Sequence, residues 1–350
     1  MKKITFYLVA LITIAGIISC QKKAAETANV EYYRGLLFSE TPFDIERGSH
    51  KLTVEEAKTI NSYKFTYDSI NRLVSVEYVR NDVLLPYSSM RGAAKIVYEY
   101  KDNKQIRHSY DAKNQIITEG DVYTSEYTLD EKGMRTGLKF LDKDGNPVEN
   151  RNKINYFTWS KLPDGKLKEN RYNLKGEEMV MNQFCPFYEL RFTYDDKGFV
   201  KLMENYQADT LYNCTAENCG EVGVSYFAFQ STDKGDLTSF SVHNTVGRLS
   251  NLYWGWAKRI NKVDENGYVV ETAIFDQDDE YLSGKNVPVT AYVVDEHGAV
   301  TEVKNMDKDR NVINHPESGV AVTQYKYDDK GLPTDTLRFD KSMVAVAKKI

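Results

Sequence analysis

Short segments that alternate apolar and polar residues, separated by polar turns, make up most of this chain. The clearest example is residues 192–200, Phe-Thr-Tyr-Asp-Asp-Lys-Gly-Phe-Val. Side chains alternate between the two faces of a β-strand, so Phe192 and Tyr194 share one face and Thr193 points to the other. A polar turn follows, and Val200 lies in the next apolar segment. The pattern predicts a β-hairpin, and degenerate copies of it recur along the sequence.

The glycine of this hairpin marks a repeat of about 32 residues, which is the signature of a tandem structural array. The marker positions are Asn71, Lys104, Gly133, Gly165, Gly198, Gly235, Gly267, Gly298 and Gly331. Six residues before each marker stand Phe65, Tyr98, Tyr127, Trp159, Phe192, Phe229, Asn261, Tyr292 and Tyr325. All but Asn261 are aromatic, so we expect this position to face the core.

The turn residues predict the geometry of the hairpins. Asp195, Asp264, Asp295 and Asp328 each lie three residues before a glycine. An Asp side chain at the start of a turn accepts backbone N–H bonds, and glycine adopts positive φ without a Cβ clash. These are the requirements of a type I turn followed by a G1 bulge. Lys104 is a poor residue for the marker position, so we expect a distorted turn there.

The repeat predicts an all-β fold. Each unit provides two strands and a further short return strand, and nine such units exceed what one flat sheet holds before it curls. We therefore expect tandem β-hairpin repeats of about 32 residues that form one long, coiling antiparallel sheet over residues 63–342, followed by a tail at 343–350. A β-propeller is the alternative, although its units usually have 40 or more residues.

The start of the chain is different in character. Lys2 and Lys3 precede a mainly apolar stretch of sixteen residues, Ile4 to Ser19, which is too short for a usual membrane span and typical of a signal peptide. Residues 1–19 look like a bacterial lipoprotein signal peptide, with Ser19 before Cys20; the resemblance implies that Cys20 is lipidated and becomes the N-terminus. An uncleaved anchor helix, or an ordinary signal peptide with an unrelated cysteine, is the alternative.

Residues 20–50 contain this cysteine, a polar tether and an N-terminal segment without a clear period. Tyr32 and Tyr33 are expected to pack on the first repeat. Within residues 51–62, Thr53 and Glu56 have the spacing of a capping box, which predicts a short helix that caps the array.

The remaining cysteines are Cys185, Cys214 and Cys219. In an exported protein, Cys214 and Cys219 are candidates for a disulfide that closes a small loop. The alternatives are a pairing that involves Cys185 and a metal site, but three cysteines without a nearby histidine are a poor zinc set.

The sequence contains none of the familiar catalytic patterns. The five histidines are scattered, and there is no zinc-protease, serine-hydrolase, P-loop or dinucleotide motif, so we expect no cofactor, no metal and no enzyme activity. Acidic turns such as Asp142-Lys-Asp144-Gly145 lack the spacing of an EF-hand and fit turn stabilisation better than calcium binding. A net charge of −5 gives no support to nucleic-acid binding.

One aromatic stretch is not required by the repeat. Tyr253, Trp254 and Trp256 lie between two units, and exposed aromatic rings on a rigid sheet can stack on sugars or peptides. Buried packing is the alternative. These three residues are the predicted ligand contacts.

The hairpin phrases resemble the YD repeat of RHS-type proteins. Residues 325–332, Tyr-Lys-Tyr-Asp-Asp-Lys-Gly-Leu, and residues 65–73, Phe-Thr-Tyr-Asp-Ser-Ile-Asn-Arg-Leu, carry the resemblance, which runs from about Tyr63 to Asp340. It implies a sheet that spirals into a shell, and an association with carbohydrate. Family members often carry an autoproteolytic core and a C-terminal toxin; we expect neither here.

Together these features predict a lipid-anchored protein of the bacterial cell envelope, in the outer membrane, with a non-catalytic binding or structural surface. Its partners would be the membrane, through the lipid on Cys20, and a glycan or an envelope protein. A glycan-acting enzyme and a protein-assembly component are the alternatives. Facing carboxylates would favour the enzyme, an exposed aromatic platform glycan binding, and a broad apolar strip assembly.

Overall fold

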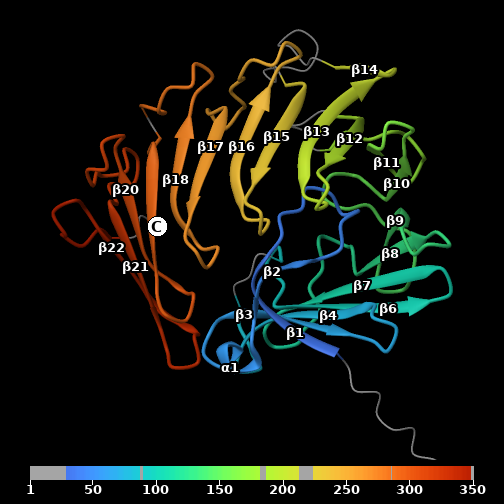
Figure 1. Ribbon diagram of the computed structural model, residues 1–350, viewed down its shortest axis with the longest axis horizontal. Helices are drawn as coiled ribbons and strands as arrows, with labels where there is room; N and C mark the ends of the chain where they lie inside the picture. The colour runs from blue at the N-terminus through green and yellow to red at the C-terminus, as the bar shows by residue number, and fades with distance from the viewer. Residues whose placement is uncertain (1–28, 87–89, 182–186, 213–223, 285, 348–350) are drawn as a thin grey trace, which may run out of the picture.

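The computed structural model describes residues 29–86, 90–181, 187–212, 224–284 and 286–347. In these residues the chain forms a single 22-stranded sheet and one short helix (Figure 1). All strand pairings are antiparallel, and successive hairpins continue the same sheet instead of forming separate blades. The predicted all-β array of tandem hairpins is confirmed, and the propeller alternative is wrong.

The sheet begins with a rearranged N-terminal segment. Strand β1 (Asn29–Leu36) lies between β2 (Gly48–Leu52) and β3 (Ser62–Tyr67), so β2 is the first edge strand. Helix α1 (Val54–Ala57) follows β2, and Thr53 and Glu56 form the reciprocal bonds of a capping box. Tyr33 packs edge-on against Phe65 of the first repeat, with 5.2 Å between ring centroids.

The other strands follow in chain order and are β4 (Leu73–Arg80), β5 (Val83–Leu84), β6 (Lys95–Lys101), β7 (Lys104–Tyr110), β8 (Thr124–Leu129), β9 (Arg135–Leu141), β10 (Tyr156–Lys161), β11 (Leu167–Tyr172), β12 (Glu189–Tyr194), β13 (Val200–Gln207), β14 (Thr210–Leu211), β15 (Tyr226–Ser231), β16 (Leu237–His243), β17 (Lys258–Val263), β18 (Val269–Phe275), β19 (Val289–Val294), β20 (Val300–Met306), β21 (Val322–Tyr327) and β22 (Pro333–Phe339). Strands β5 and β14 are two-residue strands that pair with the ends of β4 and β13. The main sheet continues from β4 to β6 and from β13 to β15.

The hairpin turns have the predicted chemistry. Asp195 Oδ1 accepts the backbone N–H groups of Lys197 at 2.9 Å and Phe199 at 2.8 Å, and Gly198 has φ +75°. The register between β12 and β13 shifts at Tyr194, as a bulge requires. An Asp in such a turn therefore stabilises the backbone.

The turn at Lys104 is a tight two-residue connection and not the distorted turn that we expected. Lys101 lies directly opposite Lys104, which leaves a two-residue connection, and β6 and β7 pair without a register shift. Asp102 adopts φ +55° in this connection. A tight two-residue hairpin needs no glycine at the marker, because residues such as Asp tolerate the left-handed conformation better than most.

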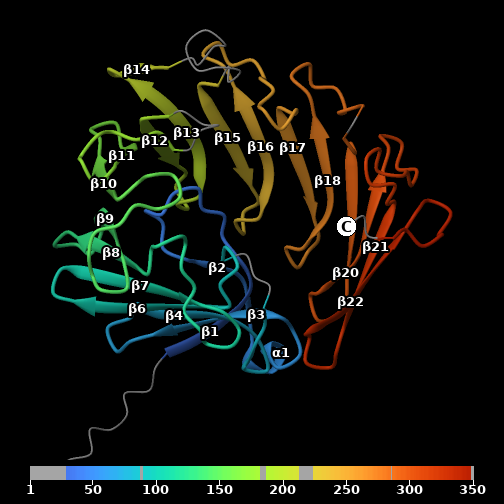
Figure 2. The same ribbon diagram turned by 180° about the vertical axis from the view of Figure 1, so that it is seen from behind.

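The sheet curls into a shell around its own N-terminal segment (Figures 1 and 2). Residues 37–47, which connect β1 to β2, run through the interior; we call them the plug. Strands β21 and β22 lie beside α1, so the two ends of the sheet approach each other. Polar contacts join the N-terminal part to later turns: His50 Nε2 lies 2.8 Å from Asp236 Oδ1, and the backbone N–H of Asn61 donates to the carbonyl of His297 at 2.7 Å.

No helix in the described ranges is long and apolar enough to cross a membrane.

Candidate functional site: the inner surface of the shell

The plug fills part of the shell with aromatic contacts. Phe38 packs on Phe229 of β15, with 5.1 Å between ring centroids, and Phe43 packs edge-on against Trp159 of β10 at 5.7 Å. Both partners belong to the core cluster of β8 to β16. The predicted core position of the repeat is therefore buried by the plug, which the repeat itself does not contain.

Arg135 of β9 fixes the plug backbone. Its Nη1 donates to the carbonyls of Pro42 at 2.9 Å, Phe43 at 3.2 Å and Asp44 at 2.8 Å. Its Nε donates to Gln105 at 2.8 Å, and the guanidinium lies 3.7 Å from the ring centroid of Tyr127. A planar guanidinium with five donors suits several acceptors at once, so this arginine has a structural role.

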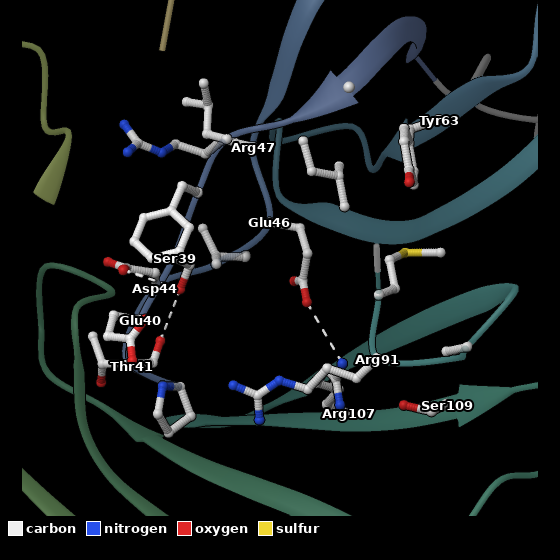
Figure 3. A pocket seen from close by; sticks show the side chains of 18 of the residues that line it. Ser39, Glu40, Thr41, Asp44, Glu46, Arg47, Tyr63, Arg91, Arg107 and Ser109 are labelled. Carbon is white, nitrogen blue, oxygen red and sulfur yellow. Dashed lines mark hydrogen bonds and ion pairs between the residues drawn. The ribbon is translucent and has the colours of Figure 1, made fainter. Parts of the chain in front are cut away.

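Two acidic residues of the plug contact the inner wall, and Figure 3 shows one of these contacts, between Glu46 and Arg107. Glu46 accepts a hydrogen bond from the Tyr98 hydroxyl, and its Oε1 lies 3.5 Å from Arg107 Nη2. Asp44 accepts bonds from Ser39 at 3.1 Å and from the Tyr194 hydroxyl at 3.0 Å. Burial raises the pKa of Asp44 and that of Tyr98. Both carboxylates therefore serve to attach the plug.

Glu169 of β11 is also fully engaged. It accepts hydrogen bonds from the Thr41 hydroxyl and from Trp159 Nε1, the latter at 2.8 Å, and its Oε1 lies 3.7 Å from Arg171 Nη1. Its side chain is only 3% exposed. The interactions orient Glu169 into the protein and not toward solvent.

Glu40 is the exception among the plug carboxylates. It forms no hydrogen bond or ion pair with any residue that the structure describes, although its side chain lines the interior cavity. Burial raises its pKa to about 7, with Glu169 acting in the same direction and Arg91 and Arg259 opposing it. Glu40 therefore titrates near neutral pH in the interior.

A cavity of about 1120 Å³ lies between the plug and the inner wall. Its lining is mixed in charge and includes Glu40, Arg91, Glu119, Arg151 and Asp236. It extends to the start of the last units, where Asn261, Val269 and Gly298 line it. The interior is therefore hydrophilic in part and continuous with the inner face of the C-terminal strands.

We call β17 to β22 the C-terminal arc, and its inner face differs from that of the earlier units. Arg259 lies directly opposite Phe240 of the core, so it points inward, as does Asn261 two residues later. Residues that lie directly opposite each other on neighbouring strands share this face. One row runs from Asn261 to Thr272, Thr290 and Asn305. Another row runs from Tyr292 to Val303, Thr323 and Arg338.

The inner face of the arc is rich in hydroxyl and amide groups, and its side chains are half-buried. None of its residues belongs to either core cluster of the described chain. Thr290, Tyr292, Thr323 and Tyr325 have hydroxyls that make no hydrogen bond with the described residues. This face therefore offers polar groups and two tyrosine rings to a ligand.

The predicted ligand contacts lie beside this face. Tyr253 is 53% exposed, whereas Trp254 and Trp256 are half-buried and pack on Phe240. Trp254 Nε1 donates to the carbonyl of Trp256 at 2.8 Å. The stretch is thus a packed aromatic cluster with one exposed ring, next to the start of β17.

Other predicted sites fall outside the described residues or lack a cluster. Cys20, Cys185, Cys214 and Cys219 lie in ranges that the structure does not describe. Among the described residues, no three His, Cys, Asp or Glu side chains are arranged to hold a metal ion.

The plug contacts were missed by sequence reasoning, because residues 37–47 show no period and their partners are distant in sequence. The sequence does contain a signal for the polar inner face of the arc. Asn261 breaks the aromatic position, and the position two residues before it changes from Phe157, Leu190 and Phe227 to Arg259, Thr290 and Thr323.

Comparisons with known proteins give weak similarities. No protein-family model matches the chain, and no curated protein matches it. The crystal structure of TcdB2-TccC3-Cdc42 is similar with 11% identity and a TM-score of 0.32, over 80% of this chain and 14% of that one. The Photorhabdus luminescens Tc holotoxin pore with the TccC3 mutation D651A has 11% identity and a TM-score of 0.28, over 80% and 14%.

A porin-like protein from Bacteroides uniformis is similar with 12% identity and a TM-score of 0.27, over 70% of this chain and 87% of that one. The chain spans about one seventh of the two toxin chains. At such low scores these similarities assign neither family nor function, and the fold rests on the strand pairings described above.

Proposed function

We propose that this β-repeat protein is a non-catalytic, lipid-anchored protein of the bacterial envelope that binds a carbohydrate chain on the inner face of the C-terminal arc. One observation carries the proposal. The repeat position six residues before the marker is aromatic and buried in the units of β8 to β16. In the arc, Asn261, Tyr292 and Tyr325 occupy this position, and all three are half-buried.

The chemistry of this face fits a sugar better than an apolar ligand. Sugars offer many hydroxyls, each both donor and acceptor, and C–H faces that stack on aromatic rings. Thr and Tyr hydroxyls and Asn amides complement the hydroxyls, and tyrosine rings complement the C–H faces. The row from Asn261 to Thr272, Thr290 and Asn305 crosses four adjacent strands and consists of such groups. Asn261, Thr272 and Asn305 also hydrogen-bond within the protein, whereas the Thr290 hydroxyl makes no hydrogen bond with the described residues.

The proposed location at the membrane is supported by the sequence and not by the sheet. The signal-peptide pattern of residues 1–19 and Cys20 support lipidation, and Gln21 replaces the Asp that commonly retains such proteins in the inner membrane. Multiple acyl chains on Cys20 would anchor the protein stably, since each buried CH₂ contributes roughly 0.8 kcal/mol. The resemblance to YD repeats supports a carbohydrate ligand.

The test is a glycan-array screen of the full-length protein, purified in detergent, beside the variant Tyr292→Ala/Tyr325→Ala. We expect binding that is lost in the double variant and kept in Val293→Ala, which changes the opposite face of β19. Binding that survives in the double variant, or no binding to any glycan, would overturn the proposal. The variant Trp254→Ala/Trp256→Ala separates the predicted aromatic contacts from the arc.

One feature favours the enzyme alternative. Glu40 has a pKa of about 7 and makes no hydrogen bond or ion pair with the described residues. Glycoside hydrolysis usually needs two accessible carboxylates that flank the bond. Glu169, Asp44 and Glu46 are each held by hydrogen bonds, so Glu40 has no free carboxylate partner among these groups. Release of reducing ends from any bound glycan, abolished by Glu40→Gln, would favour the enzyme over the proposed binding protein.

A further inference from the structure

The arginines of the inner wall fall into two groups. Arg107, Arg135 and Arg171, all on strands before β12, are engaged with Glu46, with plug carbonyls, and with the carbonyls of Phe187 and Tyr188. Arg259 and Arg338, in the C-terminal arc, form no ion pair or hydrogen bond with the residues that the structure describes. The arc therefore holds two cations on its inner face without protein anions bound to them.

On or beside the opposite face of the same strands, three cations do have carboxylate partners. Lys258 pairs with Asp279, Lys304 Nζ lies 2.7 Å from Glu302 Oε1, and Arg310 Nη2 lies 2.8 Å from Glu271 Oε1. Glu271 and Glu302 point outward, because their neighbours Thr272 and Val303 point inward. No Asp or Glu of β17 to β22 faces inward.

Arg259 is placed to bind an anion. Its Nε is buried without a hydrogen-bond partner, and its guanidinium lies 6.0 Å from the ring centroid of Phe240. Burial lowers the pKa of Arg259, whereas Tyr292 and Glu40 of the plug act in the opposite direction, and neither makes a hydrogen bond or ion pair with it among the described residues. A guanidinium with free donors matches the two oxygens of a carboxylate or sulfate.

We infer that the ligand of the C-terminal arc is an anionic polysaccharide, bearing carboxylate or sulfate groups, which Arg259 and Arg338 bind at opposite ends of the inner face. This inference rests on the proposed function and names the class of glycan. The two arginines stand on β17 and β22, five strand spacings apart, which is roughly 24 Å. A chain of several sugars spans this distance, and a single sugar does not.

The groups between the arginines suit the uncharged parts of such a chain. Tyr292 on β19 and Tyr325 on β21 are two strand spacings apart, about 10 Å. Thr290 and Thr323 lie two residues before them on the same face of the same strands. The arginines would thus neutralise the acidic groups while the tyrosines stack on the sugar rings.

The experiment is titration calorimetry of the full-length protein in detergent with polygalacturonate, chondroitin sulfate and neutral dextran. The test variant is Arg259→Gln/Arg338→Gln. The matched control is Lys262→Gln/Lys326→Gln, which removes two charges from the outer face of β17 and β21. Unfolding midpoints of both variants establish that they are folded.

We expect an acidic glycan to bind with an affinity that falls as salt rises, and the arginine variant to lose about tenfold or more, while the lysine control is unchanged. Equal binding of dextran and the acidic glycans, or equal losses in both variants, would overturn the inference and leave carbohydrate binding in place. Binding of neither class would contradict the proposed function itself. Arg259→Lys, which keeps the charge, is expected to retain part of the affinity.

Discussion

The units of β8 to β16 and those of β17 to β22 share one backbone repeat but differ in what covers their inner face. In the first group Tyr127, Trp159, Phe192 and Phe229 are at most 5% exposed and lie in one core cluster, to which Phe38 and Phe43 of the plug also pack. In the second group the equivalent side chains are half-buried and belong to neither core cluster.

The same Asp-containing turn occurs in both groups. Asp295 Oδ1 accepts the N–H groups of His297 at 3.0 Å and Ala299 at 2.8 Å, which matches Asp195 in the earlier unit. The hairpin is therefore maintained by turn and backbone bonds, and the inner side chains are free to serve packing in one region and binding in the other.

The largest expected contrast compares one repeat position in the two regions. Phe192→Ala should lower the free energy of unfolding by about 3–5 kcal/mol, because the ring is fully buried in the core. Tyr325→Ala should lower it by less than about 1 kcal/mol, because the ring is half-buried outside the core clusters. Urea unfolding followed by tryptophan fluorescence measures both; similar losses would break the comparison.

A second contrast concerns arginine. Arg135→Ala should cost about 3 kcal/mol, since it leaves plug carbonyls and Gln105 without their donors. Arg338→Ala should change stability by no more than about 0.5 kcal/mol, because it has no partner in the described protein. A large loss in the second variant would show that Arg338 is structural and not a ligand group.

The repeat, its turns and its core position could be predicted from the sequence because hairpins are local. An Asp three residues before a Gly, and an aromatic six residues before it, report the turn and the inner face within a few residues. The turn at Lys104 was not predicted correctly, because a shorter two-residue connection replaces the bulge and needs Asp102, not glycine, at positive φ.

The plug could not be predicted in the same way. Its partners Arg135, Trp159 and Tyr194 lie about 90 to 150 residues away in the chain, and no period connects them to residues 37–47. The polar inner face of the arc could be predicted in part, because Asn261 replaces the aromatic residue of the repeat. That this face is available to a ligand could not be predicted, because it depends on the plug leaving the face uncovered.

Glu40 provides a pH test of the plug. Its pKa is raised from 4.5 to about 7 by burial, so the folded state binds a proton that the unfolded state has released in this range. Stability is therefore retained below pH 4.5 and falls as pH rises to 7. Glu40→Gln should raise the free energy of unfolding at pH 8 by about 1–2 kcal/mol, after allowance for water in the cavity.

The control for this variant is Glu131→Gln in an exposed turn, which should leave the pH profile of stability unchanged. If Glu40→Gln follows the same profile as the original protein from pH 5 to 8, then Glu40 is solvated and the plug does not bury it.

The smallest expected effect concerns the exposed ring beside the arc. Tyr253→Ala should leave unfolding unchanged within about 0.5 kcal/mol, since its side chain is 53% exposed. If the ring stacks on the bound glycan, affinity should fall roughly three- to tenfold. Calorimetry of the variant with the bound glycan measures this; an unchanged affinity would limit the site to the arc itself.

Hydroxyl-radical footprinting, read by mass spectrometry, tests the central claim most directly. Without ligand, Tyr292 and Tyr325 should be oxidised readily, whereas Phe192 and Tyr127 should be protected; an acidic polysaccharide should then protect only the first pair. Equal protection of all four rings in the free protein would contradict the account, because the inner face of the C-terminal arc would then be covered and unable to bind a ligand.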